Sequence, residues 1–128
     1  MKQIYLCGGI NGLDDSQCKD WREEAKAQFS GYCIDPMRRD YRGREERREK
    51  EIVHNDIKDI IDCNYILANV SRPSWGTAME IRIAMELNRP VIGFGVPDNI
   101  SPWLKYHCEA LFENLEEAIN YINLRAQV

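Results

Sequence analysis

Two acidic residues, Glu80 and Asp56, occupy positions where the surrounding helical pattern is apolar. At 100° per residue, a helix over residues 75–88 places Glu80 inside the arc of its apolar residues, Ile81, Ile83, Ala84 and Leu87. On a helix that ends near residue 62, Asp56 borders the stripe formed by Val53, Ile57, Ile60 and Ile61. A carboxylate turned toward a core needs a partner or a raised pKa. Two such carboxylates beside one sheet are the pair that cleavage at an anomeric carbon requires.

Each carboxylate also has an ordinary explanation. Glu80 could form a salt bridge with a buried arginine, or be a polar residue near a helix start. Asp56 taken alone is typical of a surface position. The residue pattern leaves these alternatives open.

Two segments could hold an anionic or sugar ligand through their backbones. Gly8 and Gly9 end an apolar run, and Asn11 follows in the same turn, but the segment does not satisfy GxGxxG, so a dinucleotide cofactor is not expected. Ser74 stands at an N-cap position, where the free N–H groups that follow, including that of Gly76, form an anion site. Capping alone explains Ser74 equally well.

Residues 38–50 contain seven of the 17 basic residues of the chain. Such a run is most often a solvated face, although Arg38, close to a strand end, could instead reach a phosphate. Trp75 and Trp103 fall in or beside predicted loops, where they could stack on a base or simply pack.

The elements that position these residues follow from hydrophobic periodicity. Strands are predicted at residues 3–7, 32–34, 65–70 and 90–94, and helices at 14–29, from within the basic run to 62, 75–88, 101–106 and 115–125. This alternation predicts an α/β fold, a flavodoxin-like or Rossmann-like three-layer sandwich with a five-stranded, mainly parallel sheet. Ligands bind beyond the carboxyl ends of such strands, so the loops 8–13, 70–76 and 95–101 should converge on the site.

Length and composition narrow the class of protein. With 128 residues, 44% hydrophobic and 30% charged, the chain is expected to form one domain over residues 1–128. A net charge of −4 disfavours binding to a nucleic-acid polymer or an anionic membrane, and no apolar stretch approaches the length of a membrane span. Five cysteines without CxxC spacing indicate reduced thiols and no metal site, so a cytoplasmic location is expected.

Several short motifs together resemble the nucleoside 2-deoxyribosyltransferase family. They are Ile4-Tyr5-Leu6-Cys7-Gly8-Gly9, His54-Asn55-Asp56, Gly76-Thr77-Ala78-Met79-Glu80-Ile81, Pro90-Val91-Ile92 and Ser101-Pro102-Trp103-Leu104. The resemblance implies that Glu80 attacks C1′ of a 2′-deoxyribosyl group, that Asp56 assists the leaving base and that Tyr5 orients Glu80. It also implies a homodimer or larger homo-oligomer in which a neighbour donates the loop containing Ser101.

Two positions depart from the transferases. Ser74 stands where they commonly carry an acid, and Ser101 stands where they usually carry asparagine. Both residues resemble the related deoxynucleoside 5′-monophosphate N-glycosidases, whose serines hold the phosphate, whereas Gly9 differs from the serine common there. A hydroxyl in place of an acid also removes repulsion against a phosphate dianion.

The sequence thus predicts an enzyme that acts on a small deoxynucleoside or deoxynucleotide and transfers its deoxyribose to another base. The alternative within enzymes is an N-hydrolase with water as acceptor. A non-catalytic nucleotide-binding or sensing module is the alternative of another class, because function does not follow from fold.

Overall fold

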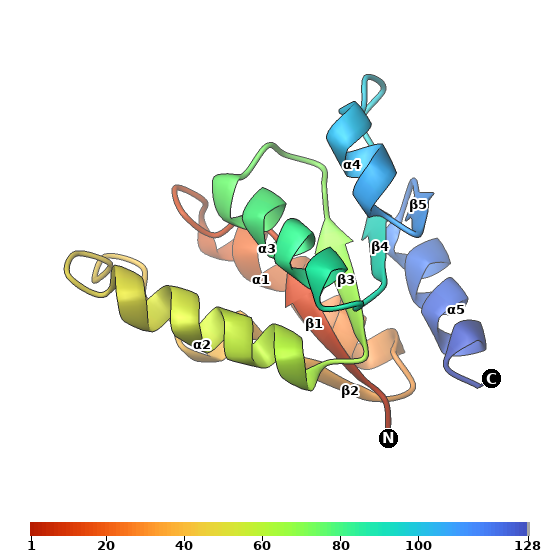
Figure 1. Cartoon of the computed structure of the whole chain (residues 1–128), viewed down its shortest axis with the longest axis horizontal. Coiled ribbons are helices and arrows are strands. Elements are labelled where there is room, and N and C mark those ends of the chain that lie inside the picture. The colour runs from red at the N-terminus through yellow and green to blue at the C-terminus, as the bar shows by residue number, and fades with distance from the viewer. Residues whose placement is uncertain (128) are drawn as a thin grey trace.

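The computed structural model describes residues 1–127 and contains one five-stranded sheet (Figure 1). Its strands are β1 (Gln3–Cys7), β2 (Tyr32–Ile34), β3 (Tyr65–Asn69), β4 (Val91–Phe94) and β5 (Ala110–Phe112). They pair in the order β2-β1-β3-β4-β5, and every pairing is parallel. This is the strand order of flavodoxin-like sheets.

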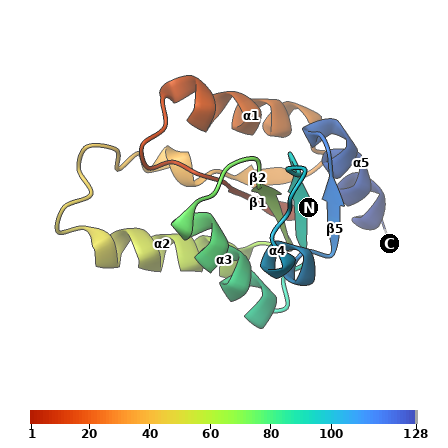
Figure 2. The same ribbon diagram turned by 90° about the horizontal axis from the view of Figure 1, so that it is seen from above.

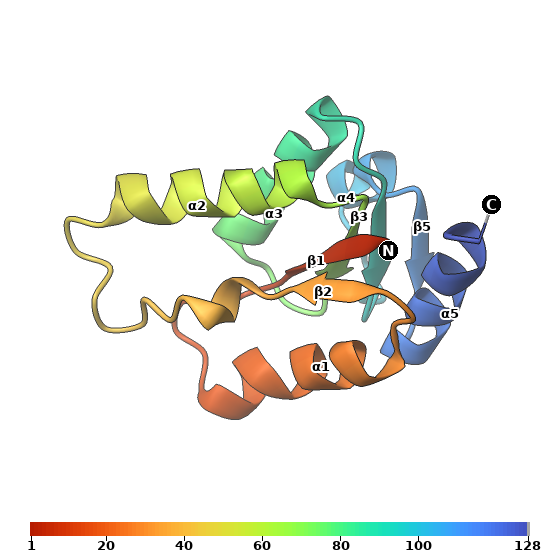
Figure 3. The same cartoon turned by 90° about the horizontal axis from the view of Figure 1, so that it is seen from below.

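Helices cover both faces of the sheet. They are α1 (Asp15–Gln28), α2 (Glu49–Asp62), α3 (Trp75–Glu86), α4 (Pro102–His107) and α5 (Leu115–Arg125), with a 3₁₀ turn, η1 (Pro36–Arg38), after β2. Figures 2 and 3 show α1 and α5 on one side of the sheet and α2, α3 and α4 on the other. The predicted α/β three-layer sandwich is therefore confirmed, and the sheet is wholly rather than mainly parallel.

Side chains of β1 alternate between two cores because successive strand residues point to opposite faces. Ile4 and Leu6 pack in the core beneath α1 and α5. Tyr5 and Cys7 pack in the core beneath α2 and α3. This alternation delivers a phenol and a thiol to the side of the sheet that carries α3.

Side chains cap the starts of α1 and α3. The Asp14 side chain accepts a hydrogen bond from the backbone N–H of Gln17 at 2.8 Å, and the Gln17 side chain accepts one from the backbone N–H of Asp14. Ser74 Oγ accepts from the N–H of Thr77 at 3.3 Å and so caps α3. α3 therefore begins directly after the cap predicted for it at Ser74.

The predicted apolar stripe of α2 is wrong in part. Ile60 is fully buried, but Val53 and Ile61 are 50% and 46% exposed. A charged residue, Asp59, takes a buried position instead, because arginines from the segment after β2 neutralise it. The count of 100° per residue places Asp59 on the side of the helix away from Val53, and so misjudges the orientation of this helix.

One strand was not located from the sequence. β5 has three half-buried residues and lies at the sheet edge, paired only with β4. So short a segment shows no periodicity of its own. Separately, none of the helices within residues 1–127 combines the length and the apolar character that crossing a membrane demands.

Candidate active site

The site lies at the centre of the sheet, where the connections that follow two adjacent strands cross to opposite faces. β1 pairs with β2 on one side and β3 on the other; α1 then leaves β1 over one face, and α3 leaves β3 over the opposite face. A crevice forms beyond the carboxyl ends of the strands at such a point. A cavity of about 210 Å³ is found there, lined by the β1–α1 loop, residues 36–45, α2 and the first half of α3.

Glu80 lines this cavity from α3, on the inward arc predicted for it. The Tyr5 hydroxyl donates a short hydrogen bond to Oε2 of Glu80. The Cys7 thiol lies 3.7 Å from Oε1 and donates to it. Both carboxylate oxygens thus have a donor from β1, which fixes the orientation of the group.

Burial, aided by the nearby charge of Asp56, raises the pKa of Glu80 to about 7, although the Tyr5 hydrogen bond opposes the shift. Asp56 lines the same cavity from α2, and burial raises its pKa to about 6 against the opposing charge of Arg39. The pair therefore holds about one proton near neutral pH. The pKa of Tyr5 lies well above 10, mainly through burial, so its phenol remains a neutral donor.

This arrangement suits attack on a carbon that carries a leaving group. An ionised carboxylate can stabilise positive charge at an anomeric carbon or bond to it, and a neighbouring acid can protonate the group that departs. One proton shared between two carboxyls supplies both forms at the same pH.

The turn after β1 brings the backbone close to the cavity. Gly8 and Asn11 line it, whereas Gly9 does not and instead faces Leu13 and Ser74. A Cβ at Gly8 would lie 2.7 Å from the Trp21 ring, too close for any side chain without displacement. Glycine at this position lets the turn sit against α1.

Arg22 fixes the same turn from the other face of the sheet. Its fully buried guanidinium donates to the carbonyls of Gly8 at 3.1 Å and Leu6 at 3.3 Å, and its Nε lies 3.6 Å from Asp35. The sequence analysis missed this residue. The signal was present, because Arg22 shares a helical stripe with Cys18, Ala25 and Phe29.

The predicted substrate-binding residues separate into two groups. Ser74 and Gly76, at the start of α3, line the cavity with Glu80. Ser101 and Trp103 line a second, more apolar cavity of about 700 Å³ between α3 and α4. Ser74 and Thr77 belong to both, so the two cavities adjoin. The loop 95–101 therefore does not converge on the carboxylates within one chain, because it follows β4, one strand further from β1.

Residues 36–45, rather than the loop 95–101, contribute to the wall of the cavity that holds the carboxylates. Arg38 does not line the cavity; both its Nη1 and Nη2 atoms donate to Asp59. Its neighbours Arg39, Tyr41 and Arg42 do line it. The sequence marked this segment as basic without indicating which of its arginines face inward.

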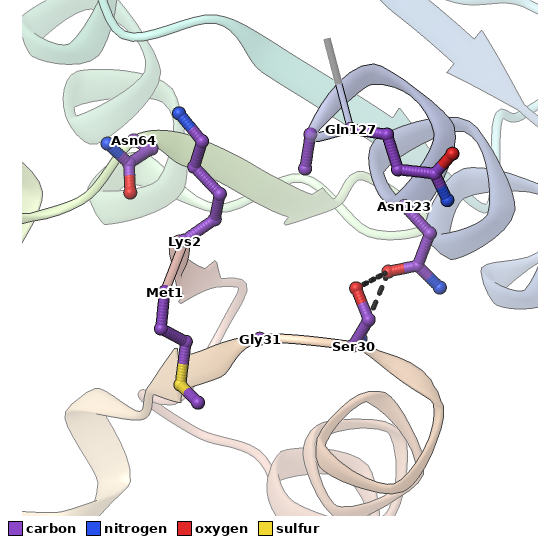
Figure 4. A pocket seen from close by; sticks show the side chains of 8 residues that line it. Met1, Lys2, Ser30, Gly31, Asn64, Asn123 and Gln127 are labelled. Carbon is purple, nitrogen blue, oxygen red and sulfur yellow. Dashed lines mark hydrogen bonds between the residues drawn. The ribbon is translucent and has the colours of Figure 1, made fainter.

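A third cavity, of about 490 Å³, lies at the opposite end of the sheet (Figure 4). Its lining includes Lys2, Asn64 and Ser30, and Ser30 bonds to Asn123. Among the described residues that line it there is no carboxylate, histidine or thiol side chain. Nor do residues 1–127 bring three or more His, Cys, Asp or Glu together in a group able to hold a metal ion.

Comparison with known proteins agrees with this geometry. A model of the nucleoside 2-deoxyribosyltransferase family matches residues 4–119. The chain belongs to this family. Membership assigns it to the enzymes that act on the glycosidic bonds of nucleosides or nucleotides. Among curated proteins, none matches the sequence significantly.

Solved structures share the fold of this family member at low sequence identity. A 2-deoxyribosyltransferase from Bacillus psychrosaccharolyticus has a TM-score of 0.73 and 18% identity, over 94% of this chain and 90% of that one. A conserved protein from Enterococcus faecalis has a TM-score of 0.79 and 13% identity, over 98% and 99%. A CMP N-glycosidase from Clostridium botulinum has a TM-score of 0.62 and 16% identity, over 99% and 100%. Such likenesses establish the fold.

Proposed function

We propose that this enzyme cleaves the N-glycosidic bond of 2′-deoxyribonucleosides or their 5′-monophosphates and transfers the deoxyribose to another base. The observation that supports this most directly is the carboxylate of Glu80, turned into a cavity and held on both oxygens by Tyr5 and Cys7. Asp56, in the same cavity, is the group that serves the leaving base.

In the first step an oxygen of Glu80 bonds to C1′ while the C1′–N bond breaks and its electron pair passes to the base. The carboxyl proton of Asp56 goes to the departing nitrogen. In the second step a new base attacks C1′, returns its proton to Asp56 and frees Glu80. Two displacements at C1′ retain its configuration.

Water as the second acceptor is the other candidate, and Ser74 is the observation that favours it. Ser74 places a hydroxyl at the start of α3 in the cavity, where the free N–H groups and the positive helix end suit a phosphate. A 5′-monophosphate is the kind of substrate on which the N-glycosidase neighbour acts, since CMP is one. The same covalent intermediate serves both outcomes.

We also propose that the enzyme works as a homo-oligomer in the cytoplasm, with all five cysteines as free thiols. Trp75 and Met79 are 85% and 62% exposed on α3, and Trp103 and Tyr106 are exposed on the adjacent α4. A contiguous apolar face of this kind is typical of an interface. A second copy on this face would bring its Ser101 loop near the cavity of the first. Replacing Met79 by Lys should then yield monomers by light scattering.

The test of the reaction is a base-exchange assay with 2′-deoxynucleosides and their monophosphates, run with and without free adenine or cytosine. Transfer requires a new nucleoside to appear; hydrolysis releases base without one.

Glu80→Ala should abolish base release while ligand binding persists. Glu86→Ala, on the exposed end of the same helix, should leave base release unchanged. Intact mass after rapid denaturation should show a deoxyribosyl adduct that Glu80→Ala lacks. Absence of base release from every substrate would overturn the proposal in favour of a binding module.

A further inference from the structure

Two arginines of the basic segment share one buried carboxylate. Arg38 donates to both oxygens of Asp59, at 2.9 and 2.8 Å, and Nη2 of Arg39 donates to Oδ2 at 2.6 Å. Asp59 is only 5% exposed. Two positive charges thus meet one buried negative charge, and the second carboxyl near them is that of Asp56, 3.8 Å from Arg39.

Arg39 differs from Arg38 in what it faces. It lines the cavity together with Asp56 and Glu80, and its Nη2 lies 3.8 Å from Oδ1 of Asp56. Its Nε is buried and has no hydrogen-bond partner among residues 1–127. Buried donors are rarely left unpaired, because a donor removed from water without a partner destabilises the folded protein. Nε itself is enclosed by protein, so a ligand in the cavity would meet Arg39 through the exposed quarter of its side chain.

The Asp59 contact also makes Arg39 a fixed group. A guanidinium is planar, so a bond from Nη2 to a buried carboxylate limits where its other N–H groups can point. Residues 39–48 connect η1 to α2 (Figure 3), and the 3.8 Å between Nη2 of Arg39 and Oδ1 of Asp56 places the guanidinium beside the acid on α2. The donor is therefore in place before any ligand binds.

We infer that Arg39 is a catalytic residue that stabilises the departing base, an inference that rests on the proposed function. As the C1′–N bond breaks, its electron pair spreads over the base, onto the ring nitrogens and exocyclic oxygen next to the scissile bond. Arg39 donates a hydrogen bond to one of these atoms and keeps its own protons, while Asp56 supplies the proton that the base gains. Charge on the base appears only as the bond breaks, so Arg39 acts on rate more than on binding.

Leaving-group strength separates this role from a structural one. The pairs to compare are 2′-deoxyuridine with its 5-fluoro derivative, and 2′-deoxyguanosine with its N7-methyl derivative, as nucleosides and as 5′-monophosphates. 5-Fluorouracil stabilises the negative charge that it gains better than uracil does, and N7-methylguanine departs as a neutral base, so each modified base depends less on a hydrogen-bond donor. Arg39→Gln should lower kcat/KM roughly 100-fold for the unmodified substrate, the order of magnitude for loss of one transition-state donor, and far less for the modified one.

Arg38→Gln is the matched control, because it removes the other arginine from Asp59 and does not face the cavity. Arg38→Gln should lower kcat/KM by the same small factor for both substrates of a pair. Arg39→Lys retains the positive charge without the planar guanidinium, so its kcat/KM for the unmodified substrate should lie between those of wild type and Arg39→Gln. If Arg39→Gln has a lowered melting temperature, Arg39→Lys is used in its place.

Equal losses for both substrates of a pair, or an Arg39 variant that behaves like Arg38→Gln, would overturn the inference while leaving the proposed function intact. If the wild-type protein cleaves none of the four nucleosides or their monophosphates, the proposed function itself is overturned. The two failures are therefore distinct.

Discussion

Replacing Glu80 by glutamine should stabilise the protein at alkaline pH while it removes the proposed nucleophile. Burial moves the pKa of this carboxyl from 4.5 to about 7 in the folded protein. At about 1.4 kcal/mol for each tenfold change, the ionised form costs the folded state about 3 kcal/mol. A glutamine side chain has nearly the same size and no charge to bury.

The sign follows from the direction of the pKa shift. An acid whose folded pKa is raised favours folding fully below its unfolded pKa, and that contribution is lost as pH rises through the folded value. For Glu80 the window runs from about 4.5 to about 7. Wild-type stability should thus fall by about 2–3 kcal/mol relative to Glu80→Gln between pH 5 and pH 8.

Urea unfolding at pH 5 and pH 8, followed by circular dichroism, measures this difference directly. Glu86→Gln is the control, because Glu86 lies on the same helix and is exposed beside Arg82. Its unfolding free energy should differ from wild type by less than about 0.5 kcal/mol at both pH values. If Glu80→Gln showed the same pH dependence as wild type, the carboxyl would not be buried in the way described, and its assignment as a preorganised nucleophile would fail with it.

Three further outcomes are expected. Activity should be bell-shaped in pH, with limbs near 6 and 7 set by the carboxyl pair, and Asp56→Asn should remove the alkaline limb and lower kcat/KM about 100-fold or more. Tyr5→Phe removes a donor from Glu80, so the pKa of Glu80, the higher of the pair, should rise; the alkaline limb of the kcat/KM profile should then move to higher pH and the maximum should fall, and an unmoved limb would mean that the hydrogen bond does not tune Glu80. Gly8→Ala should lower the free energy of unfolding in urea by about 1–3 kcal/mol, because its Cβ would meet the Trp21 ring at 2.7 Å; unchanged stability would show that the turn can shift.

The sequence was sufficient to place Glu80 because the surrounding helix has a regular apolar arc. A charge inside such an arc is visible to a count of 100° per residue, and α3 does turn this residue toward the cavity. The turn at Gly8 and the cap at Ser74 were equally accessible, because both depend on local backbone chemistry. These features need no knowledge of distant contacts.

Features set by tertiary contacts were less accessible. β5 has only three residues, and its strand character comes from pairing with β4. The place of Ser101 depends on strand order, since β4 lies beyond β3 in the sheet, and this separates its loop from the carboxylates. Arg22 was detectable by the same count that found Glu80, which shows that an inward-facing charge need not be catalytic.

A single interaction accounts for two features of the segment after β2 that the sequence did not reveal. Asp59 is separated by about twenty residues from Arg38 and Arg39, so no local pattern indicates that they pair. The pairing lets Asp59 occupy a buried position on α2, which accompanies the exposure of Val53 and Ile61. It also holds Arg39 beside Asp56, where a basic run that resembled a solvated face becomes part of the cavity wall. The orientation of the helix and the composition of the site are therefore consequences of the same buried ion pair.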